Sequence, residues 1–296
     1  MRERADPSAR REPWLPFLPA LLLVALVIAL PILGVVLLSF TRVELEGGLV
    51  PHWAGIRPAL RLWQDTRFFG ALRNTVVFTG ASVLLETLLG VAFALVLNRS
   101  FPGRGLVRSV TLIPWALPTA VMALSFSWIF NDSFGVANDL LRRAGLAKEP
   151  VAWLSDPLPA MAAIVLSDVW KTVPFVALIV LAGLQGIPEE VLEAARMDGL
   201  GAWRRFRWVV FPLLLPSILV AAVFRAAQAW GAFDIVYVMT GGGPGGSTET
   251  VSLYAFQTFF RYLDFGYAAA IATHATLLAA ALALVGSLGR RRKGAS

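Results

Sequence analysis

The sequence predicts an all-α integral membrane protein with six transmembrane helices and both termini in the cytoplasm. The first observation is composition: 57% of the 296 residues are hydrophobic, and the mean hydropathy is +0.69. The second is that the apolar residues form six long runs with few or no charges, each long enough to cross a bilayer core, which takes about 20 residues. The third is that most arginines flank these runs, which is the usual signature of membrane topology.

Composition also excludes several classes of site. The chain has no cysteine, which excludes disulfides, thiolate nucleophiles and cysteine-ligated zinc. It has two histidines, His52 and His274, so we expect no histidine-based metal site. The net charge of +7 could suit a nucleic-acid partner, but the arginines flank apolar runs instead. We therefore expect no cofactor, no metal, no catalytic residue and no nucleic acid.

The first half of the chain should contain three spans. Residues 1–13 are polar and are expected to form a cytoplasmic tail. The apolar run that follows is too long for a signal peptide and lacks a small-residue cleavage site, so we expect it to be retained as a span. Pro114 and Pro118 lie inside the third run, where they should kink the helix. The expected spans are 14–40, 71–97 and 106–130.

The second half should contain three more spans. The fourth run carries only Asp168 and Lys171 as charged residues, and the fifth carries only Arg225. The last run leads into a basic tail, 290–296, which we expect to be cytoplasmic. The expected spans are 160–184, 209–231 and 267–289, so residues 14–289 would form a single transmembrane domain.

Positive charge sets the predicted orientation. With the N-terminus inside, the inside segments carry fifteen Lys and Arg residues, whereas the longer outside segments carry eight. Positively charged short loops stay on the cytoplasmic side, so both termini are predicted to be cytoplasmic. The segment between the fourth and fifth spans is then cytoplasmic too.

That segment contains a short helix-forming stretch, 188–199, that differs from the apolar runs around it. Pro188 suits the first position of a helix, and the two glutamates after it suit the first turn, where the helix dipole favours acids. Gly199 suits the C-terminal stop. One interpretation is an amphipathic helix that lies on lipid, but the stretch carries four acids and one arginine, and anionic lipid would repel it. A protein partner is therefore favoured.

Several motifs together resemble one family of transporters. The stretch "EAARMDG" at 193–199, followed nine residues later by "VVFP", resembles the EAA signature of binding-protein-dependent ABC importer permeases. The resemblance covers roughly residues 70–285 and extends to sugar permeases of this family. Among the sugar permeases, this chain is similar to the class related to the larger permease subunit of the maltose transporter, although this chain has no large extra outer domain. The further motifs are "IPWALPTAVMAL" at 113–124, "WKTVPF" at 170–175, "LAGLQGIPEE" at 181–190 and "FDIVYVMTGGGPGGSTET" at 233–250.

The resemblance implies a type I ABC importer permease fold in the inner membrane, with a sugar as the solute. It also implies three protein partners: a second permease subunit that forms a heterodimer, a cytoplasmic ATPase dimer and an extracytoplasmic solute-binding protein. The helix at 188–199 would be the coupling helix that docks on the ATPase. ATP hydrolysis would reside in that separate subunit, so this chain is not expected to be an enzyme. The residues implied in coupling are Glu193, Ala194, Ala195, Asp198 and Gly199.

Polar and aromatic residues inside the spans are candidates for the solute pathway, because ionisable groups are costly in a bilayer. Asp168 and Lys171 share a helix face and could instead neutralise each other. Arg225 could line the pathway, snorkel to the outer interface or pair with Asp234. Glu86 has no evident partner in the sequence and could face a neighbouring subunit. The pathway candidates are Asp168, Trp170, Lys171, Arg225, Gln228 and Trp230.

Two alternative functions stay open at this point. A permease for glycerol phosphate or another small polar solute is one, since Arg225 could bind a phosphate group. An intramembrane protease is the other, with His274 as a base and Ser125 or Ser127 as a nucleophile. The stretch "GGGPGGST" lacks the lysine of a phosphate-binding loop, so we expect no nucleotide site. The sequence does not identify the solute.

Overall fold

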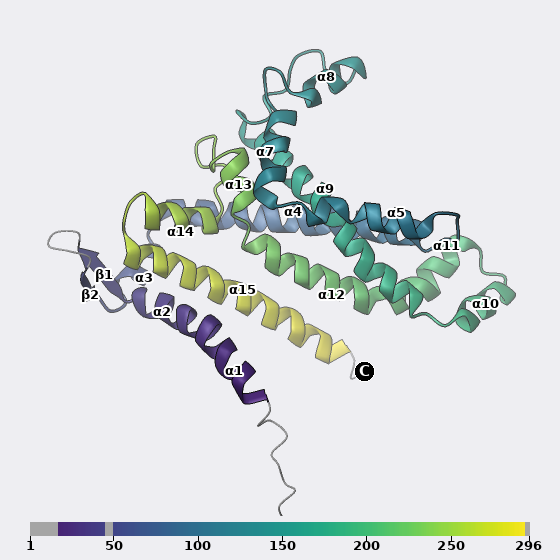
Figure 1. Ribbon diagram of the computed structural model, residues 1–296, viewed down its shortest axis with the longest axis horizontal. Helices are drawn as coiled ribbons and strands as arrows, with labels where there is room; N and C mark the ends of the chain where they lie inside the picture. Colours follow the sequence, from purple (N-terminus) through teal and green to yellow (C-terminus); the bar gives the residue numbers. More distant parts are fainter. Residues whose placement is uncertain (1–16, 45–49, 294–296) are drawn as a thin grey trace, which may run out of the picture. The chain divides into compact units, whose positions relative to one another are not determined.

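The computed structural model describes residues 17–44 and 50–293 (Figure 1). The predicted tail 1–13, the first residues of the first predicted span and the last three residues of the chain lie outside the described residues. The described chain divides into two compact units. One comprises the residues up to Gln64 together with Thr258–His274, and the other comprises Asp65–Gln257 together with the residues from Ala275 onward.

The first unit contains a membrane-length helix that is continuous over Leu18–Leu38. It consists of α1 (Leu18–Val24), the π-helical turn η3 (Ala25–Ala29) and α2 (Leu30–Leu38). None of these residues is buried against the rest of the described chain. A helix that is apolar on every side and still unburied within its own chain is typical of a lipid-facing span.

A small hairpin follows this helix. Strand β1 (Thr41–Glu44) pairs antiparallel with β2 (Val50–Trp53), with the first residue of β1 opposite the last residue of β2. The Ala54 amide donates to the Phe40 carbonyl at 2.8 Å, which closes the hairpin against the end of the helix. The short helix α3 (Arg57–Leu62) comes next.

Three long helices form the centre of the second unit: α4 (Thr66–Leu97), α9 (Pro157–Gln185) and α12 (Phe211–Trp230). Asp65 is the N-cap residue of α4, and its carboxylate accepts hydrogen bonds from the backbone amides of Arg67 and Phe68. Among the five membrane-length helices, α9 is the most buried. The buried apolar residues between the three helices include Phe78 and Ala94 from α4, Ile164, Val176 and Val180 from α9, and Leu214, Ile218 and Ala221 from α12.

The helix that contains α12 is longer than the predicted span. It is continuous over Ala202–Trp230 and includes α11 (Ala202–Arg205) and the π-helical turn η4 (Phe206–Val210), so it begins before the predicted start at 209. η3 and η4 each end two residues before a proline, Pro31 and Pro212. A proline cannot donate to the carbonyl four residues back, and a local widening into a π turn accommodates this missing hydrogen bond.

The third predicted span, 106–130, is not one straight helix. The helical stretches Arg104–Ala116 and Thr119–Ile129 meet at 88°. The break falls at Leu117 and Pro118, which both adopt extended backbone angles. The ring of a proline disfavours the helical conformation of the residue before it, so Pro118 accounts for the position of the break. Pro114, by contrast, lies in the first turn of a helix, where proline is tolerated.

Shorter helices connect the long ones. In the part of the chain that the structure describes, five helices are long and apolar enough to cross a membrane, or six when the bent pair counts as one span. This confirms the predicted class, an all-α integral membrane protein, to which the structure adds one two-stranded hairpin. The remaining helices are α5 (Arg104–Thr111), α6 (Ile113–Ala116), α7 (Thr119–Ile129), α8 (Val136–Arg143), α10 (Glu189–Met197), α13 (Asp234–Met239), α14 (Val251–Phe260) and α15 (Phe265–Lys293).

Gly90 gives a direct test of how closely α4 and α9 pack. A β-carbon at Gly90 would lie 2.5 Å from Cγ1 and 2.8 Å from Cβ of Val176, whereas one at Gly80, on the same helix, would meet nothing within 4 Å. We expect Gly90→Ala to destabilise the protein by about 1–3 kcal/mol through overpacking. Gly80→Ala should be neutral or slightly stabilising, because alanine favours the helix. Unfolding midpoints of the detergent-purified variants would measure both, and equal midpoints would contradict the close packing.

Candidate functional site

A buried polar cluster joins the three central helices of the second unit. Arg225 on α12 donates from Nε to Oε2 of Glu86 on α4 at 2.6 Å and from Nη2 to Oε1 at 2.9 Å. Nη2 also donates to Oδ2 of Asp168 on α9 at 3.0 Å. The Thr172 hydroxyl lies 2.6 Å from Oε1 of Glu86. Each charged group therefore has a partner of opposite charge on another helix.

The charged members of this cluster are almost fully enclosed: Glu86 is 0% exposed, Arg225 4% and Asp168 8%. A two-pronged contact between guanidinium and carboxylate is the strongest common form of ion pair. Burying such charges is unfavourable unless every one is paired and hydrogen-bonded. The cluster meets this condition, and it fixes α4, α9 and α12 at one level of the helix bundle.

The other predicted pathway residues lie around this cluster with different exposure. Gln228 is exposed, and its Oε1 accepts from Nη1 of Arg225 at 2.7 Å. Trp170 is 46% exposed, and its ring lies 5.2 Å from that of Phe126. The Nε1 of Trp230 donates to the Ala275 carbonyl at 3.1 Å. The structure thus brings Asp168, Arg225 and Gln228 into direct contact and gives both tryptophans other partners.

Three pairings considered from the sequence differ in the structure. Glu86 has a partner within the chain, Arg225, although the sequence shows none. Arg225 pairs with Glu86 and Asp168, so the pairing with Asp234 is also wrong. Among the described residues, Lys171 forms no ion pair with Asp168, and it donates instead to the hydroxyl of Thr119 at 3.0 Å.

One signal in the sequence could have found the cluster. Glu86 is the single charged residue between Asn74 and Asn98, and Arg225 is the single charged residue between Trp208 and Phe233. Isolated opposite charges in two spans are expected to pair, because neither can stay unpaired in a bilayer. Thr172, which sequence reasoning missed, lies one helical turn after Asp168 and therefore on the same face.

The candidate coupling segment forms helix α10, which spans Glu189–Met197. Pro188 lies just outside the helix with extended backbone angles, so it is the N-cap residue and not the first helical residue. The helix ends in the hydrogen-bond pattern of a Schellman motif: the Gly199 amide donates to Arg196, and the Leu200 amide donates to Ala195. Gly199 has a φ of +73°, which a residue with a side chain rarely adopts.

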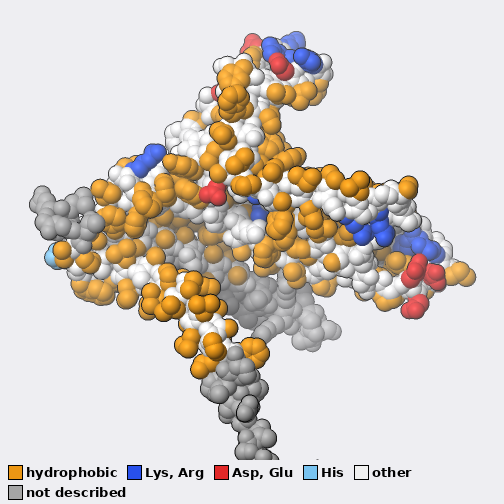
Figure 2. Space-filling model, viewed as in Figure 1, with side chains coloured by type: hydrophobic (Ala, Val, Ile, Leu, Met, Phe, Trp, Pro, Cys, Tyr) orange, Lys and Arg blue, Asp and Glu red, His pale blue; other side chains and the backbone are white. Residues whose placement is uncertain are grey.

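The predicted coupling residues differ in exposure. Glu193, Ala194, Asp198 and Gly199 are exposed, and Ala195 is buried. Met197 on the same helix is 87% exposed. Figure 2 shows acidic and basic side chains gathered at the α10 end of the second unit, whereas much of the remaining visible surface is hydrophobic. α10 is thus a capped, charged helix between two membrane-length helices.

A second polar group in this unit fixes the glycine-rich loop, residues 240–250, against the start of α4. Arg67 donates to both carboxylate oxygens of Glu249, at 2.9 and 2.7 Å. Nδ2 of Asn74 donates to the Gly246 carbonyl at 2.8 Å and to the Glu249 carbonyl at 3.1 Å. The hydroxyl of Thr75 accepts from the amide of Val251 at 2.9 Å. These contacts hold the loop mainly through its backbone.

No metal-ligand set accompanies these polar groups. Within residues 17–44 and 50–293, no group of three or more His, Asp or Glu side chains is arranged to hold a metal ion. The candidate functional site thus has three parts: the buried Glu86–Asp168–Arg225 cluster, helix α10 and the glycine-rich loop at residues 240–250.

The sequence profile described as "Binding-protein-dependent transport system inner membrane component" matches residues 86–294. This stretch includes α9, α10 and α12 and covers more than half of the chain. The chain belongs to this family. It is therefore a multi-pass inner-membrane permease component of a binding-protein-dependent transport system.

Curated relatives and a solved structure agree with this assignment. The chain is 42% identical to the trehalose/maltose transport system permease protein MalF of Thermococcus litoralis, over 87% of this chain and 86% of that protein. It is also 42% identical to the sulfoquinovosyl glycerol transport system permease protein SmoG of Agrobacterium fabrum, over 86% and 82%. The fold is similar to that of a chain in the crystal structure of a bacterial alginate ABC transporter in complex with alginate pentasaccharide-bound periplasmic protein. There the TM-score is 0.79 at 21% identity, over 94% of this chain and 93% of that chain, and the likeness shows the permease fold.

Proposed function

We propose that this permease is a transmembrane subunit of an ATP-driven importer of sugars. It forms half of the translocation pathway and transmits the conformational change of a separate cytoplasmic ATPase. The observation that carries the proposal is α10, a charged and capped helix held between two membrane-length helices. The names of the relatives, which transport trehalose, maltose or a sulfoquinovosyl glycerol, support sugars as the solute class.

The proposed assembly contains a second permease subunit, an ATPase dimer and an extracytoplasmic solute-binding protein. Family membership supports the binding protein directly, since it is part of the family description. Both termini of the permease and α10 then lie in the cytoplasm, and a single transmembrane domain extends over 14–289. ATP hydrolysis takes place in the ATPase, so this subunit needs no catalytic residue of its own.

In this proposal, the coupling contact is made by the exposed side of α10. Glu193 offers an exposed carboxylate to a basic residue of the ATPase, and Ala194 lets the partner approach the helix backbone closely. Ala195 is buried and holds the helix against its own chain. Asp198 and Gly199 end the helix and set the direction in which the chain enters the fifth span.

The solute pathway is proposed to lie beside the buried cluster and not through it. Arg225 is already paired with both Glu86 and Asp168. Its remaining Nη1 group orients Gln228, whose exposed amide can hydrogen-bond a hydroxyl group. Trp170 adds a half-exposed aromatic face, on which a sugar ring can pack. Lys171 and Trp230 border this region through their contacts with Thr119 and Ala275.

The two alternatives receive less support from the geometry. A phosphate-bearing solute would need a guanidinium that is not already neutralised, yet Arg225 contacts two carboxylates. For the protease, a ring nitrogen of His274 lies 2.8 Å from the Ala270 carbonyl. The hydroxyls of Ser125 and Ser127 donate to carbonyls of their own helix. These contacts do not form a nucleophile–base pair.

Transport by the reconstituted complex tests the proposal. The permease would be purified with its partner permease and ATPase, placed in proteoliposomes with the binding protein, and supplied with radiolabelled trehalose, maltose, a sulfoquinovosyl glycerol or glycerol phosphate. We expect ATP-dependent uptake of at least one of the three sugar compounds. Uptake of glycerol phosphate alone, or purification of the permease without any ATPase, would refute the proposed function.

A further inference from the structure

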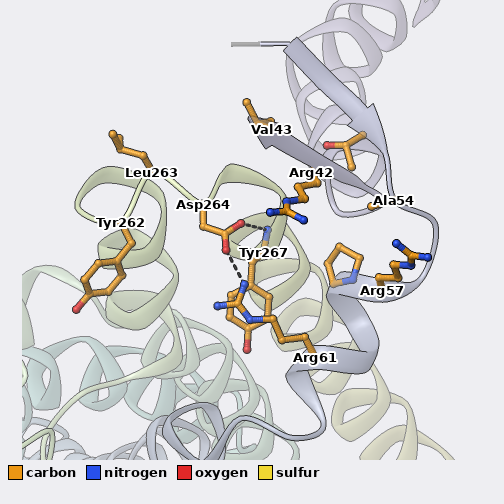
Figure 3. A pocket seen from close by; sticks show the side chains of 11 residues that line it. Arg42, Val43, Ala54, Arg57, Arg61, Tyr262, Leu263, Asp264 and Tyr267 are labelled. Carbon is orange, nitrogen blue, oxygen red and sulfur yellow. Dashed lines mark hydrogen bonds and ion pairs between the residues drawn. The ribbon is translucent and has the colours of Figure 1, made fainter. Parts of the chain in front are cut away.

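A polar pocket lies in the first unit, next to the end of the span Leu18–Leu38. Its volume is about 790 Å³. Figure 3 shows the labelled side chains around it, with Arg42 reaching toward Asp264, and with Arg57 on the side opposite Tyr262. The lining comes from β1, α3 and the segment that leads into α15: Thr41, Arg42, Val43, Ala54, Arg57, Pro58, Arg61, Tyr262, Leu263, Asp264 and Tyr267.

The charge of this pocket is strongly positive. Its lining has three arginines and a single carboxylate. That carboxylate, Asp264, is already engaged, because it accepts from Nη1 of Arg61 at 2.6 Å and from the Tyr267 amide at 3.2 Å. The Arg61 guanidinium also lies 4.0 Å from the centre of the Tyr267 ring. Within residues 17–44 and 50–293, the exposed side chains of Arg42 and Arg57 form no ion pair.

The position of the pocket along the bilayer follows from the length of the adjoining helix. Leu18–Leu38 has 21 residues and is therefore about 31 Å long, which matches the hydrocarbon core of a bilayer. Arg42 follows the end of this helix by four residues. Asp264 directly precedes α15, the other membrane-length helix that begins in this unit. Both helices thus place the pocket at the level of the lipid headgroups.

The chemistry around the pocket suits a lipid more than an acidic peptide. Guanidinium groups bind phosphate through paired hydrogen bonds. The helix beside the pocket offers a continuous apolar surface, with Val35 and Leu37 exposed near its end. Tyr262 and Leu263, both exposed, add amphipathic and apolar side chains at the rim, and tyrosine is typical of membrane interfaces. An acidic peptide would use the arginines but not the adjoining apolar helix.

We propose that this pocket binds the phosphate group of an anionic phospholipid, with the acyl chains of the lipid along the span Leu18–Leu38. Arg42 and Arg57 would contact the phosphate, while Arg61 is held in place by Asp264. A zwitterionic lipid carries a compensating cation, which the surplus positive charge of the pocket would repel. The site therefore selects phosphatidylglycerol over phosphatidylcholine.

Native mass spectrometry of the detergent-purified full-length permease complex tests this site. The complex would be titrated with dioleoyl-phosphatidylglycerol and, separately, with dioleoyl-phosphatidylcholine. The test variant is Arg42→Gln with Arg57→Gln. The matched control is Arg143→Gln with Lys148→Gln, which removes the same charge from exposed positions of the segment around α8. We expect the test variant to lose about tenfold in apparent affinity for phosphatidylglycerol, as for the loss of a charge-assisted contact, and the control to keep wild-type affinity.

Several results would overturn the proposal. Equal retention of phosphatidylglycerol by the test and control variants would show that the pocket does not hold the lipid. Displacement of the lipid by equimolar inorganic phosphate would show a site for a free anion. A test variant that keeps the lipid but no longer binds the solute-binding protein would show a protein-docking surface. If the double variant fails to fold, the single change Arg57→Gln, at an exposed side chain, is expected to show the same selective loss.

Discussion

Replacing Glu86 with alanine is expected to destabilise the membrane domain by about 3–5 kcal/mol, the usual effect of removing one partner from a buried ion pair. The change leaves Arg225 enclosed with only part of its hydrogen bonds and removes the polar contacts of α4 with α9 and α12. The unfolding midpoint of the detergent-purified permease would measure the loss. Asp139→Ala on α8 is the matched control, because its ion pair with Arg142 has a similar length, 2.5 Å, but both side chains are about half exposed. Exposed pairs contribute about 0–1 kcal/mol.

A companion variant separates the structural role of the cluster from its effect on transport. Replacing Glu86 with methionine, Asp168 with leucine and Arg225 with methionine removes all three charges together. Because apolar residues of similar size can substitute for a buried ion network, we expect most of the stability to return. Sugar uptake should stay low, since Gln228 loses the group that orients it. An unchanged midpoint in Glu86→Ala would show that the cluster does not hold the helices together.

Replacing Gly199 with valine is expected to reduce ATP-driven uptake at least tenfold while the permease remains folded. The φ of +73° at Gly199 is strongly unfavourable for a β-branched residue, so the end of α10 must change its direction. A displaced α10 would no longer align Glu193 with the proposed contact on the ATPase. Uptake and ATPase activity of the same proteoliposomes would show whether hydrolysis continues without transport.

Gly201→Val is the matched control for this prediction. Gly201 lies two residues further along but has an ordinary φ of −60°, and a β-carbon there would meet nothing within 4 Å. Valine at this position should leave uptake close to the wild-type rate.

A second pair, Glu193→Ala and Glu189→Ala, compares the proposed contact residue with an exposed acid at the start of the helix. Full uptake in both Gly199→Val and Glu193→Ala would exclude α10 as the coupling element.

The sequence predicts the membrane fold well because its signals are local. An apolar run of about 20 residues can cross a bilayer as a helix, which satisfies its backbone hydrogen bonds internally. In the described part of the chain, each of the six predicted runs overlaps a helical stretch, the third of them a bent pair. The end of α10 was predictable for the same reason, since a glycine after an acidic helix-forming stretch is a local signal for a C-terminal stop. Pro118 likewise gives the position of the break in the third run.

Long-range geometry was less accessible. The 88° angle at Pro118 depends on what α7 packs against, including α13, and proline alone does not set it. Asp168 and Lys171 share a helix face, so their spacing in the sequence favours an ion pair between them. In the structure, however, Asp168 pairs with Arg225 from another helix. The packing of two helices decides which of their residues face each other. This packing depends on contacts between distant parts of the chain, so the pattern of a single sequence does not predict it.

The length of α4 has a mechanical consequence. Three residues in the first part of α4, Arg67, Asn74 and Thr75, hold the glycine-rich loop. Glu86 lies further along the same helix, about 18 Å from Asn74 at a rise of 1.5 Å per residue. A continuous helix transmits an axial displacement with little internal deformation. A protein that presses on the loop would therefore shift the Glu86–Arg225 contact directly, without any intermediate segment.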